Sequence, residues 1–389
     1  MTTTLSTRDL NRALMARQLL LDRREMSALG AIEHLVGMQG EEPHEPYVSL
    51  WSRLQRFQPD ELVELLQGRR VVRTLLMRRT LHLVTAGDAL TWRPLHQPML
   101  ETRAMGTLRR SLPGVDLAQL AAAGRPFFEE RPRTLPEVGR AVGERWPHVA
   151  PRDLGDALSS FVALVQVPPR GIWGETAPAR NTTIEAWLGT SLADSPPPAD
   201  DLVLRYLAAY GPAASAAVRS WSGLSGLPAV TARLRPRLRT FRDGRGRELL
   251  DTPDGLLPPS DVPVPPRFLP AFDNAVLGFD DRTRIIDDSN RGLSVAGARF
   301  LLVDGRVAGT WQVTRNGDVA ALRVTELSNL ATRDRDAVVV EGRTTPSVPQ
   351  WHSRPCRFRS ILSAGSSGKR ENSLAPQSSK RHPRCGRPQ

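Results

Sequence analysis

The stretch that organises this chain is Leu35-Val36-Gly37-Met38-Gln39-Gly40-Glu41-Glu42-Pro43, which follows an amphipathic helical run and breaks into a turn marked by Gly and Pro. It places an amide, Gln39, and a carboxylate, Glu41, two residues apart where a helix is expected to end. Residues at i and i+2 do not share a helical face, but an extended turn can direct both side chains into one cleft. The stretch is either a candidate water-activating site or an ordinary polar helix end.

Around this stretch the sequence predicts a winged helix. Apolar residues spaced three and four apart predict helices before and after it, and alternation with β-branched residues predicts a strand pair. The expected helices cover 8–22, 26–38, 46–57 and 59–67, and the strand pair covers 71–84. The wing formed by this pair would carry Arg73, Arg78, Arg79 and His82.

The same order of elements is predicted twice more. The second unit has a long helix over 87–109, broken near Pro94 and Pro98, helices over 116–129, 135–145 and 152–164, and a strand, turn and strand over 165–174 that carries Arg170 and Trp173. The third has helices over 200–210, 213–221 and 227–234, and a hairpin of 237–242 and 247–251 that turns at Asp243-Gly244 and carries Arg235, Arg237, Arg239 and Arg242. A Pro-rich segment, 195–198, separates the two units.

The character of the chain changes after Pro258-Pro259. Strands are expected at 300–303, 307–313 and 319–327, with turns at Asp304-Gly305 and Asn316-Gly317. The predicted fold is therefore mainly α with β hairpins (α+β). Three tandem winged-helix units, 1–90, 91–198 and 199–260, precede a small antiparallel β domain, 261–341. In that domain Asp273, Asn274 and Arg282 either form a polar network or face DNA.

The last 48 residues differ from the rest in composition. Residues 342–389 contain ten Lys or Arg and one Glu, whereas residues 1–341 contain 43 basic and 40 acidic residues. Both cysteines, Cys356 and Cys385, and the only lysines, Lys369 and Lys380, lie in this tail. The tail is predicted to have little order, either as a basic arm for DNA or as a frameshifted end.

The residues missing from positions 1–341 exclude several chemistries. Without Cys or Lys there is no thiolate nucleophile and no Schiff-base catalysis. The five histidines show no metal-ligand spacing and no phosphate-binding glycine loop is present, so neither a metal nor a cofactor is expected. No run of 18 apolar residues occurs and the N-terminus lacks a secretory pattern, so we expect a cytoplasmic protein without membrane contact.

Three strings together resemble a known family: HLVGMQGEEPHEPYVSLWSRL (34–54), RRTLHLVTAGD (78–88), and PRFLPAFDNAVLGFDDRTR (266–284) with GTW (309–311) further on. They are similar to the winged-helix DNA-binding proteins of the AlkZ/YcaQ-like DNA glycosylase family. The resemblance covers about residues 7–341, and it implies three tandem winged-helix units, a C-terminal β domain and excision of alkylated bases. The family signature, Gln, any residue, then Gln or Asp, maps onto Gln39 and Glu41, so that Glu41 departs from the pattern.

The resemblance and the chemistry together predict a monofunctional glycosylase acting on N7- or N3-substituted purines. Gln39 would hold a water by hydrogen bonds, and Glu41 would act as general base and stabilise the oxocarbenium-like transition state. Without lysine a lyase step is not expected. The partner would be double-stranded DNA with alkylated or crosslinked bases, and we expect a monomer, associated with the nucleoid when bound to DNA.

Phosphate contacts are expected from the wing arginines Arg73, Arg78, Arg79, Arg170, Arg237 and Arg239. His82 either contacts the DNA backbone or lesion or is an ordinary core or hairpin histidine. Two alternatives remain: a non-enzymatic winged-helix DNA-binding protein or transcription regulator, and a glycosylase homologue without activity.

Overall fold

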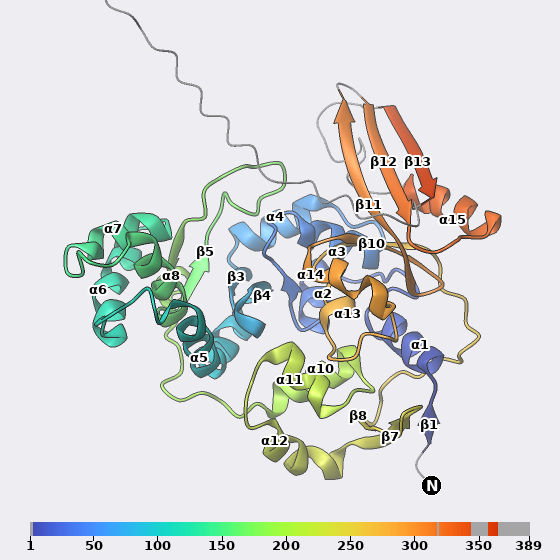
Figure 1. Cartoon of the computed structure of the whole chain (residues 1–389), viewed down its shortest axis with the longest axis horizontal. Helices are drawn as coiled ribbons and strands as arrows, with labels where there is room; N and C mark the ends of the chain where they lie inside the picture. Colours follow the sequence, from blue (N-terminus) through green and yellow to red (C-terminus); the bar gives the residue numbers. More distant parts are fainter. Residues whose placement is uncertain (1–2, 317–318, 344–356, 365–389) are drawn as a thin grey trace, which may run out of the picture.

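A computed structural model describes residues 3–316, 319–343 and 357–364 (Figure 1). The chain begins with β1 (Thr4–Leu5) and α1 (Thr7–Arg17). Ser6 caps α1 because its side chain accepts from the Asp9 amide while the Asp9 carboxylate accepts from the Ser6 amide.

The first set of helices and strands surrounds Gln39. It contains α2 (Ala28–His34), β2 (Met38–Gln39), α3 (Glu45–Arg53), α4 (Pro59–Gln67), β3 (Val71–Leu75), the short η1 (Met77–Arg79) and β4 (Leu81–Thr85). The expected helix over 26–38 is too long, because Val36 and Gly37 adopt left-handed φ values of 59° and 84°. The two residues turn the chain out of α2 and into a strand that pairs with β4.

The second set follows a single long helix. It contains α5 (Ala86–Leu108), α6 (Leu117–Glu130), α7 (Leu135–Gly143), α8 (Pro151–Phe161), β5 (Leu164–Gln166), β6 (Asn181–Thr183) and α9 (Ile184–Leu188). Two predictions are wrong here. α5 continues through Pro94 and Pro98, and the strand that pairs with β5 lies at 181–183, beyond the expected 165–174, because Pro168 and Pro169 cannot donate to a ladder.

The hairpins of the first two sets form one sheet. The five strands run in the order β2-β4-β3-β5-β6, and β3 pairs with β5 through Arg73↔Gln166 and Thr74↔Val165. β3 is therefore a central strand rather than part of a free wing. This arrangement buries side chains that the sequence alone places on an exposed hairpin.

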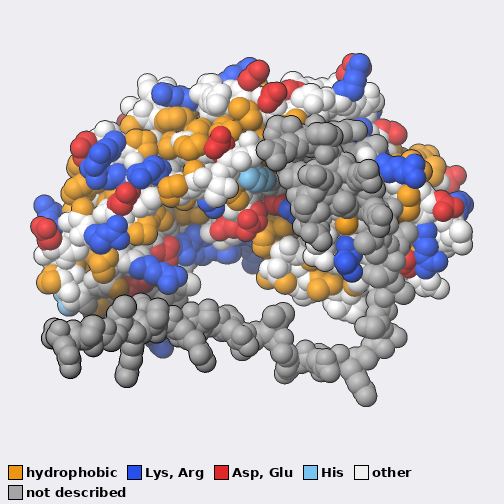
Figure 2. All heavy atoms as spheres, turned by 90° about the horizontal axis from the view of Figure 1, so that it is seen from above, with side chains coloured by type: hydrophobic (Ala, Val, Ile, Leu, Met, Phe, Trp, Pro, Cys, Tyr) orange, Lys and Arg blue, Asp and Glu red, His pale blue; other side chains and the backbone are white. Residues whose placement is uncertain are grey.

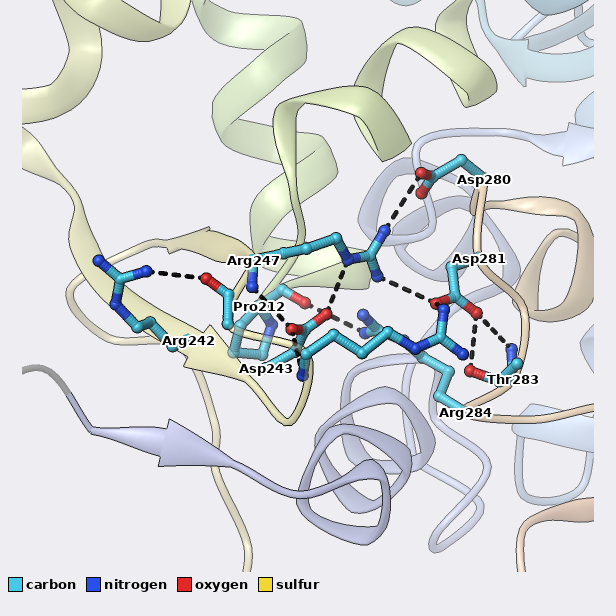
Figure 3. A network of polar contacts seen from close by, with 10 residues as sticks. Pro212, Arg242, Asp243, Arg247, Asp280, Asp281, Thr283 and Arg284 are labelled. Atoms are coloured by element: carbon cyan, nitrogen blue, oxygen red, sulfur yellow. Dashed lines mark hydrogen bonds and ion pairs between the residues drawn. The ribbon is translucent and has the colours of Figure 1, made fainter.

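The third set matches its prediction closely. It contains α10 (Asp200–Tyr210), α11 (Ser215–Ser222), α12 (Leu227–Leu234), η2 (Arg235–Arg237), β7 (Arg239–Asp243) and β8 (Glu248–Asp251). The predicted hairpin is confirmed by the pairing of Arg239 with Asp251, and β1 adds a parallel strand to β7. Arg247 joins this hairpin to the following loop by donating to Asp243 at 2.7 Å and to Asp281 at 3.1 Å (Figure 3).

A five-stranded sheet completes the fold. Its elements are β9 (Arg267–Ala271), α13 (Asn274–Leu277), η3 (Asp288–Asn290), α14 (Arg291–Val295), β10 (Arg299–Val303), β11 (Arg306–Asn316), β12 (Val319–Glu326), α15 (Thr332–Gly342) and β13 (Arg357–Ala364). The predicted strands β10, β11 and β12 pair antiparallel, as expected. Two strands that were not predicted flank them: β9 pairs antiparallel with β10, and β13 pairs in parallel with β12. The tail thus contributes a strand. Residues 344–356 and 365–389, for which little order was predicted, lie outside the described residues.

The C-terminal sheet shares its core with the first set. Phe268, Trp311 and Leu322 pack in one apolar cluster with residues of α2, α3 and α4, and Ser52 donates to the carbonyl of Phe268 at 2.5 Å. Figure 1 shows the sheet beside α3 and α4, with α6–α8 on the opposite side of the molecule. Among the described helices, none is both long and apolar enough to cross a membrane.

Candidate active site

Gln39 ends β2 opposite His82 of β4. Its half-buried amide oxygen Oε1 lies 3.3 Å from Nη2 of Arg78 and 3.4 Å from the Thr80 hydroxyl. Both neighbours belong to the turn that joins β3 to β4. The side chain is thus held by the turn and not by its own short strand.

Glu41 lies just beyond β2 and is exposed. The backbone N–H of Gly40 donates to the Leu81 carbonyl at 2.8 Å, and the N–H of Leu81 donates to Oε2 of Glu41 at 3.0 Å. The carboxylate therefore takes the place of the next ladder partner of β4. Gln39 contacts Thr80 and Glu41 contacts Leu81. The two side chains are therefore anchored on consecutive residues at the end of one turn.

The two side chains border different cavities. Gln39 lines a cavity of about 10 Å³ together with Asp273, Asn274 and Tyr210. Glu41 lines another, of about 230 Å³, between the first and second sets. The lining of the larger cavity includes Leu75, Leu81, Leu135, Leu164, Gln166 and Arg170. Of the two side chains, Glu41 lines the larger cavity and Gln39 lines the smaller one.

Arg78 lies in the left-handed region, at φ 60°, and directs its guanidinium inward. It donates to the Trp221 carbonyl at 2.9 Å and to the amide oxygens of Gln39 and Asn274, both at 3.3 Å. Within the described residues it forms no ion pair with a carboxylate. Burial lowers the pKa of Arg78 to about 10, so that the group remains charged at neutral pH.

Arg73 does not face solvent as predicted. It is 1% exposed, and Nη2 donates to the carbonyl of Gly40 at 2.6 Å. Burial lowers the pKa of Arg73 to about 10. Arg73 lies on a central strand, because β5 pairs with β3. Its guanidinium supports the backbone of the turn that carries Glu41 and, being buried, does not reach a phosphate.

His82 is also buried, with no exposed surface. Its Nδ1 lies 3.0 Å from the Thr80 carbonyl, and burial lowers its pKa to about 3, so that the ring is neutral near pH 7. The sequence left two roles open for His82, a contact with DNA or an ordinary core or hairpin position. Its complete burial fits a core histidine.

The remaining predicted arginines lie at the surface or partly covered. Arg79 donates to Asp156 and Ser160, both at 2.9 Å, and Arg170 donates to the Ala177 carbonyl at 2.9 Å. Arg237 is exposed, whereas Arg239 pairs with the fully buried Asp251 at 3.0 Å. Among the described side chains of the predicted site residues, a hydrogen bond joins Gln39 to Arg78. The other arginines are dispersed: Arg79 lies in the turn between β3 and β4, Arg170 between β5 and β6, and Arg237 and Arg239 at the start of the third hairpin.

The surface view shows a hollow between two sides of the molecule, with arginine side chains on its inner wall and acidic side chains near its rim (Figure 2). Acidic and basic groups alternate over the rest of this face. Such a surface fits the nearly balanced charge of residues 1–341, and any nucleic-acid interface on it is a local one.

Asp273 and Asn274 reach the site through partners that no local sequence pattern indicates. Arg53 donates to both carboxylate oxygens of Asp273, at 2.8 and 2.9 Å, and both side chains are buried. Asn274 contacts Arg78. The strings that contain these residues were recognised, but their partners lie about two hundred positions away, and no local pattern indicates such pairs. The third member, Arg282, instead donates to Ser294 at 2.7 Å.

Among the described residues, no group of three or more His, Cys, Asp or Glu side chains could hold a metal ion. The site is thus defined by an amide, a carboxylate and buried arginines, on a fold of repeated helix–hairpin sets.

Comparison with solved structures finds a protein of the same fold. The structure is similar to Streptomyces sahachiroi DNA glycosylase AlkZ, with a TM-score of 0.74 and 20% sequence identity, over 92% of this chain and 100% of that one. At this identity the likeness shows a shared fold. None of the curated proteins searched matches the chain.

The sequence profile of the family described as "DNA glycosylase AlkZ-like" matches residues 32–345. The chain therefore belongs to the AlkZ-like DNA glycosylase family. Membership supports DNA as the partner and DNA repair as the functional class.

Proposed function

We propose that the chain is a monofunctional DNA N-glycosylase that hydrolyses the N-glycosidic bond of N7- or N3-alkylated purines in double-stranded DNA. The observation that supports this most is the anchoring of Gln39 and Glu41 on consecutive residues of one turn. These two residues are also the positions of the family signature.

The carboxylate of Glu41 is placed for chemistry at the sugar. One oxygen is fixed by the Leu81 amide, and the other has no hydrogen-bond partner among the described residues. The free oxygen can orient or deprotonate water and can stabilise positive charge at the anomeric carbon. General-base assistance of this kind is worth roughly 10²–10⁴-fold in rate.

The leaving group explains why one carboxylate suffices. A purine alkylated at N7 or N3 is cationic and departs without a strong general acid. Residues 1–341 contain no lysine, so a Schiff base with the abasic sugar is not expected. The proposed product is therefore an abasic site with the phosphodiester backbone intact.

We propose that the three helix–hairpin sets are winged-helix units. In each set a first helix is followed by two further helices and a hairpin. A short segment after the first helix also pairs with the hairpin: β2 pairs with β4 in the first set, Arg133 with Asn181 in the second, and Ala213 with Leu250 in the third. The boundaries 1–90, 91–198, 199–260 and 261–341 remain our proposal, with the qualification that the last part shares its core with the first.

Arg79, Arg170 and Arg237 remain candidates for phosphate contact, since none is buried. Arg239 is held by the fully buried Asp251, whereas Asp156, the partner of Arg79, is half exposed. Arg73 and His82 are buried and Arg78 is directed toward Gln39, so we do not assign these three or Arg239 to the DNA surface. We further propose a cytoplasmic monomer that associates with the nucleoid through DNA.

Incubation with duplexes that carry N7-methylguanine or N3-methyladenine, scored for abasic sites after alkali, tests the proposal. We expect Glu41→Gln to lower the single-turnover rate by about 100-fold or more while DNA affinity changes little. Glu42→Gln is the matched control, because Glu42 is the adjacent exposed carboxylate. Sequence-specific duplex binding without excision by the wild type would favour the alternative, a non-enzymatic DNA-binding protein or regulator.

A further inference from the structure

We propose that Arg78 and Asn274 are positioning residues that fix the direction of the Gln39 amide, so that Gln39 acts on the reacting groups as a hydrogen-bond donor. This inference rests on the proposed glycosylase function and assigns a task to the Asp273-Asn274 string, which that function leaves unused.

The direction of the amide follows from the chemistry of arginine. A guanidinium has N–H donors and no acceptor, so the Gln39 atom that lies 3.3 Å from Nη2 of Arg78 is the oxygen. The NH₂ group must then point away from Arg78. An amide held in this way offers hydrogens, and not a lone pair, to whatever lies beyond it.

Asn274 is held by the same nitrogen. Its Oδ1 also lies 3.3 Å from Nη2 of Arg78, and an Nη group has two hydrogens, one for each amide. The residue is 6% exposed, and its Nδ2 has no hydrogen-bond partner in the part of the chain that the structure describes. The two amides are therefore oriented as a pair, although one comes from β2 and the other from α13.

The charge of Arg78 strengthens this arrangement. Buried cations are normally paired with carboxylates, but Arg78 has three uncharged acceptors and no ion pair within the described residues. A cation beside an amide oxygen polarises the amide and makes its N–H groups better donors.

The small cavity beside the pair has the right size and lining for one water molecule. Its volume is about 10 Å³, and Gln39, Asn274 and Asp273 contribute polar groups to its wall. One water there would accept from Nδ2 of Asn274 and donate to the carboxylate of Asp273. This would connect the Arg53–Asp273 ion pair to the amide pair without a direct contact.

The consequence is a division of roles at the site. Gln39 donates to the oxygen of the attacking water or to an acceptor on the damaged nucleotide. Glu41, whose second oxygen is free, is then the acceptor that takes the proton.

The replacement Gln39→Glu separates a donor from an acceptor role. The introduced carboxylate keeps the shape of the side chain and accepts from Arg78, but it cannot donate because the nearby cation keeps it ionised. We expect the single-turnover excision rate to fall as far as in Gln39→Ala. A rate within about threefold of the wild-type rate would show that Gln39 serves as an acceptor. That result would overturn the inference.

A second comparison tests the positioning residues. Arg78→Met removes the charged donor to the Gln39 oxygen, whereas Asn274→Asp keeps the acceptor but pairs the charge of Arg78 with a carboxylate. Each should lower the single-turnover rate by about 10- to 100-fold, the size of a hydrogen bond to a charged group, with the duplex Kd nearly unchanged. Arg78→Lys should recover part of the loss, since an ammonium can donate to both oxygens. Arg284→Met is the matched control, because Arg284, like Arg78, has its pKa lowered to about 10 by burial, and it donates to the Pro212 carbonyl away from Gln39 (Figure 3).

The inference fails if Arg284→Met and Arg78→Met lower the rate equally, because the loss would then reflect general destabilisation. If Arg78→Met does not fold, Asn274→Asp and Gln39→Glu decide the question. A wild-type protein that excises no alkylated base would instead contradict the proposed function, so the two failures are distinguishable.

Discussion

At the scale of single residues, Glu41 stands where the family pattern has Gln or Asp. Its longer side chain is used, since Oε2 reaches the Leu81 amide at 3.0 Å. Aspartate is one methylene shorter and would keep either this anchor or the position of the free oxygen, but not both.

We therefore predict that Glu41→Asp retains excision at a rate reduced by roughly tenfold, a milder loss than the full general-base effect. Single-turnover excision from an N7-methylguanine duplex measures this. A rate as low as that of Glu41→Gln would mean that the length of the side chain matters as much as its charge.

The buried histidines predict sensitivity to acid. Burial lowers the pKa of His82 to about 3 and that of His96 to about 4, below the ordinary value near 6.5. Below pH 6.5 the unfolded chain binds protons that the folded protein does not, so the free energy of unfolding should fall as pH drops. Each histidine contributes up to about 1.4 kcal/mol per pH unit until its folded pKa is reached.

Urea unfolding at pH 7, 6 and 5 checks this prediction. His82→Gln removes one of the two titrating groups and should flatten the dependence by about half. A wild-type protein with equal stability at pH 7 and pH 5 would show that these rings are protonated in the folded state.

The residues themselves show what sequence could predict. Gln39 and Glu41 could be proposed from sequence because their pattern is local, and their role stays a prediction. The exposure of Arg73 was mispredicted, because alternation on a hairpin does not show whether another strand will pair with it, and here β5 pairs with β3. The hydrogen bond from Arg78 to Asn274 joins residues 196 positions apart, and no local sequence pattern indicates such a contact.

At the scale of elements, the turn between α2 and β2 positions the site. Gly37 has a φ of 84°, and a Cβ there would lie 2.6 Å from Cγ1 of Val84. Helical spacing continues past this turn, which is why sequence extended the helix to residue 38.

We predict that Gly37→Ala destabilises the protein by about 2–4 kcal/mol, from backbone strain and overpacking together, and slows excision. Gly114→Ala is the control, since Gly114 also has a positive φ but no atom within 4 Å of its Cβ position. Thermal unfolding of both variants separates strain from the clash; equal losses would exclude a role for Val84.

At the scale of the whole molecule, the buried Arg53–Asp273 pair joins the first set to the C-terminal sheet. Sequence predicted the strands β10, β11 and β12 of this sheet, but it predicted neither β9 and β13 nor the core that the sheet shares with the N-terminal helices. Charge and periodicity describe each segment separately and contain no information on such contacts.

We predict that Asp273→Ala lowers the free energy of unfolding by about 3–5 kcal/mol, because it leaves a buried guanidinium unpaired. Glu25→Ala removes the exposed pair with Arg56 and should have little effect. Calorimetry should show one transition that moves as a whole. A separate early transition in Asp273→Ala would mean that the sheet unfolds independently.

The docking of α1 has a consequence for synthesis on the ribosome. Arg17 pairs with Asp251 and Arg12 with Asp304, and both arginines are buried. At 5–20 residues per second, roughly 15–60 s pass between translation of α1 and translation of Asp304. The first helix to be made is thus among the last to reach its place, and until then its cationic face is open to chaperones and other nascent-chain factors.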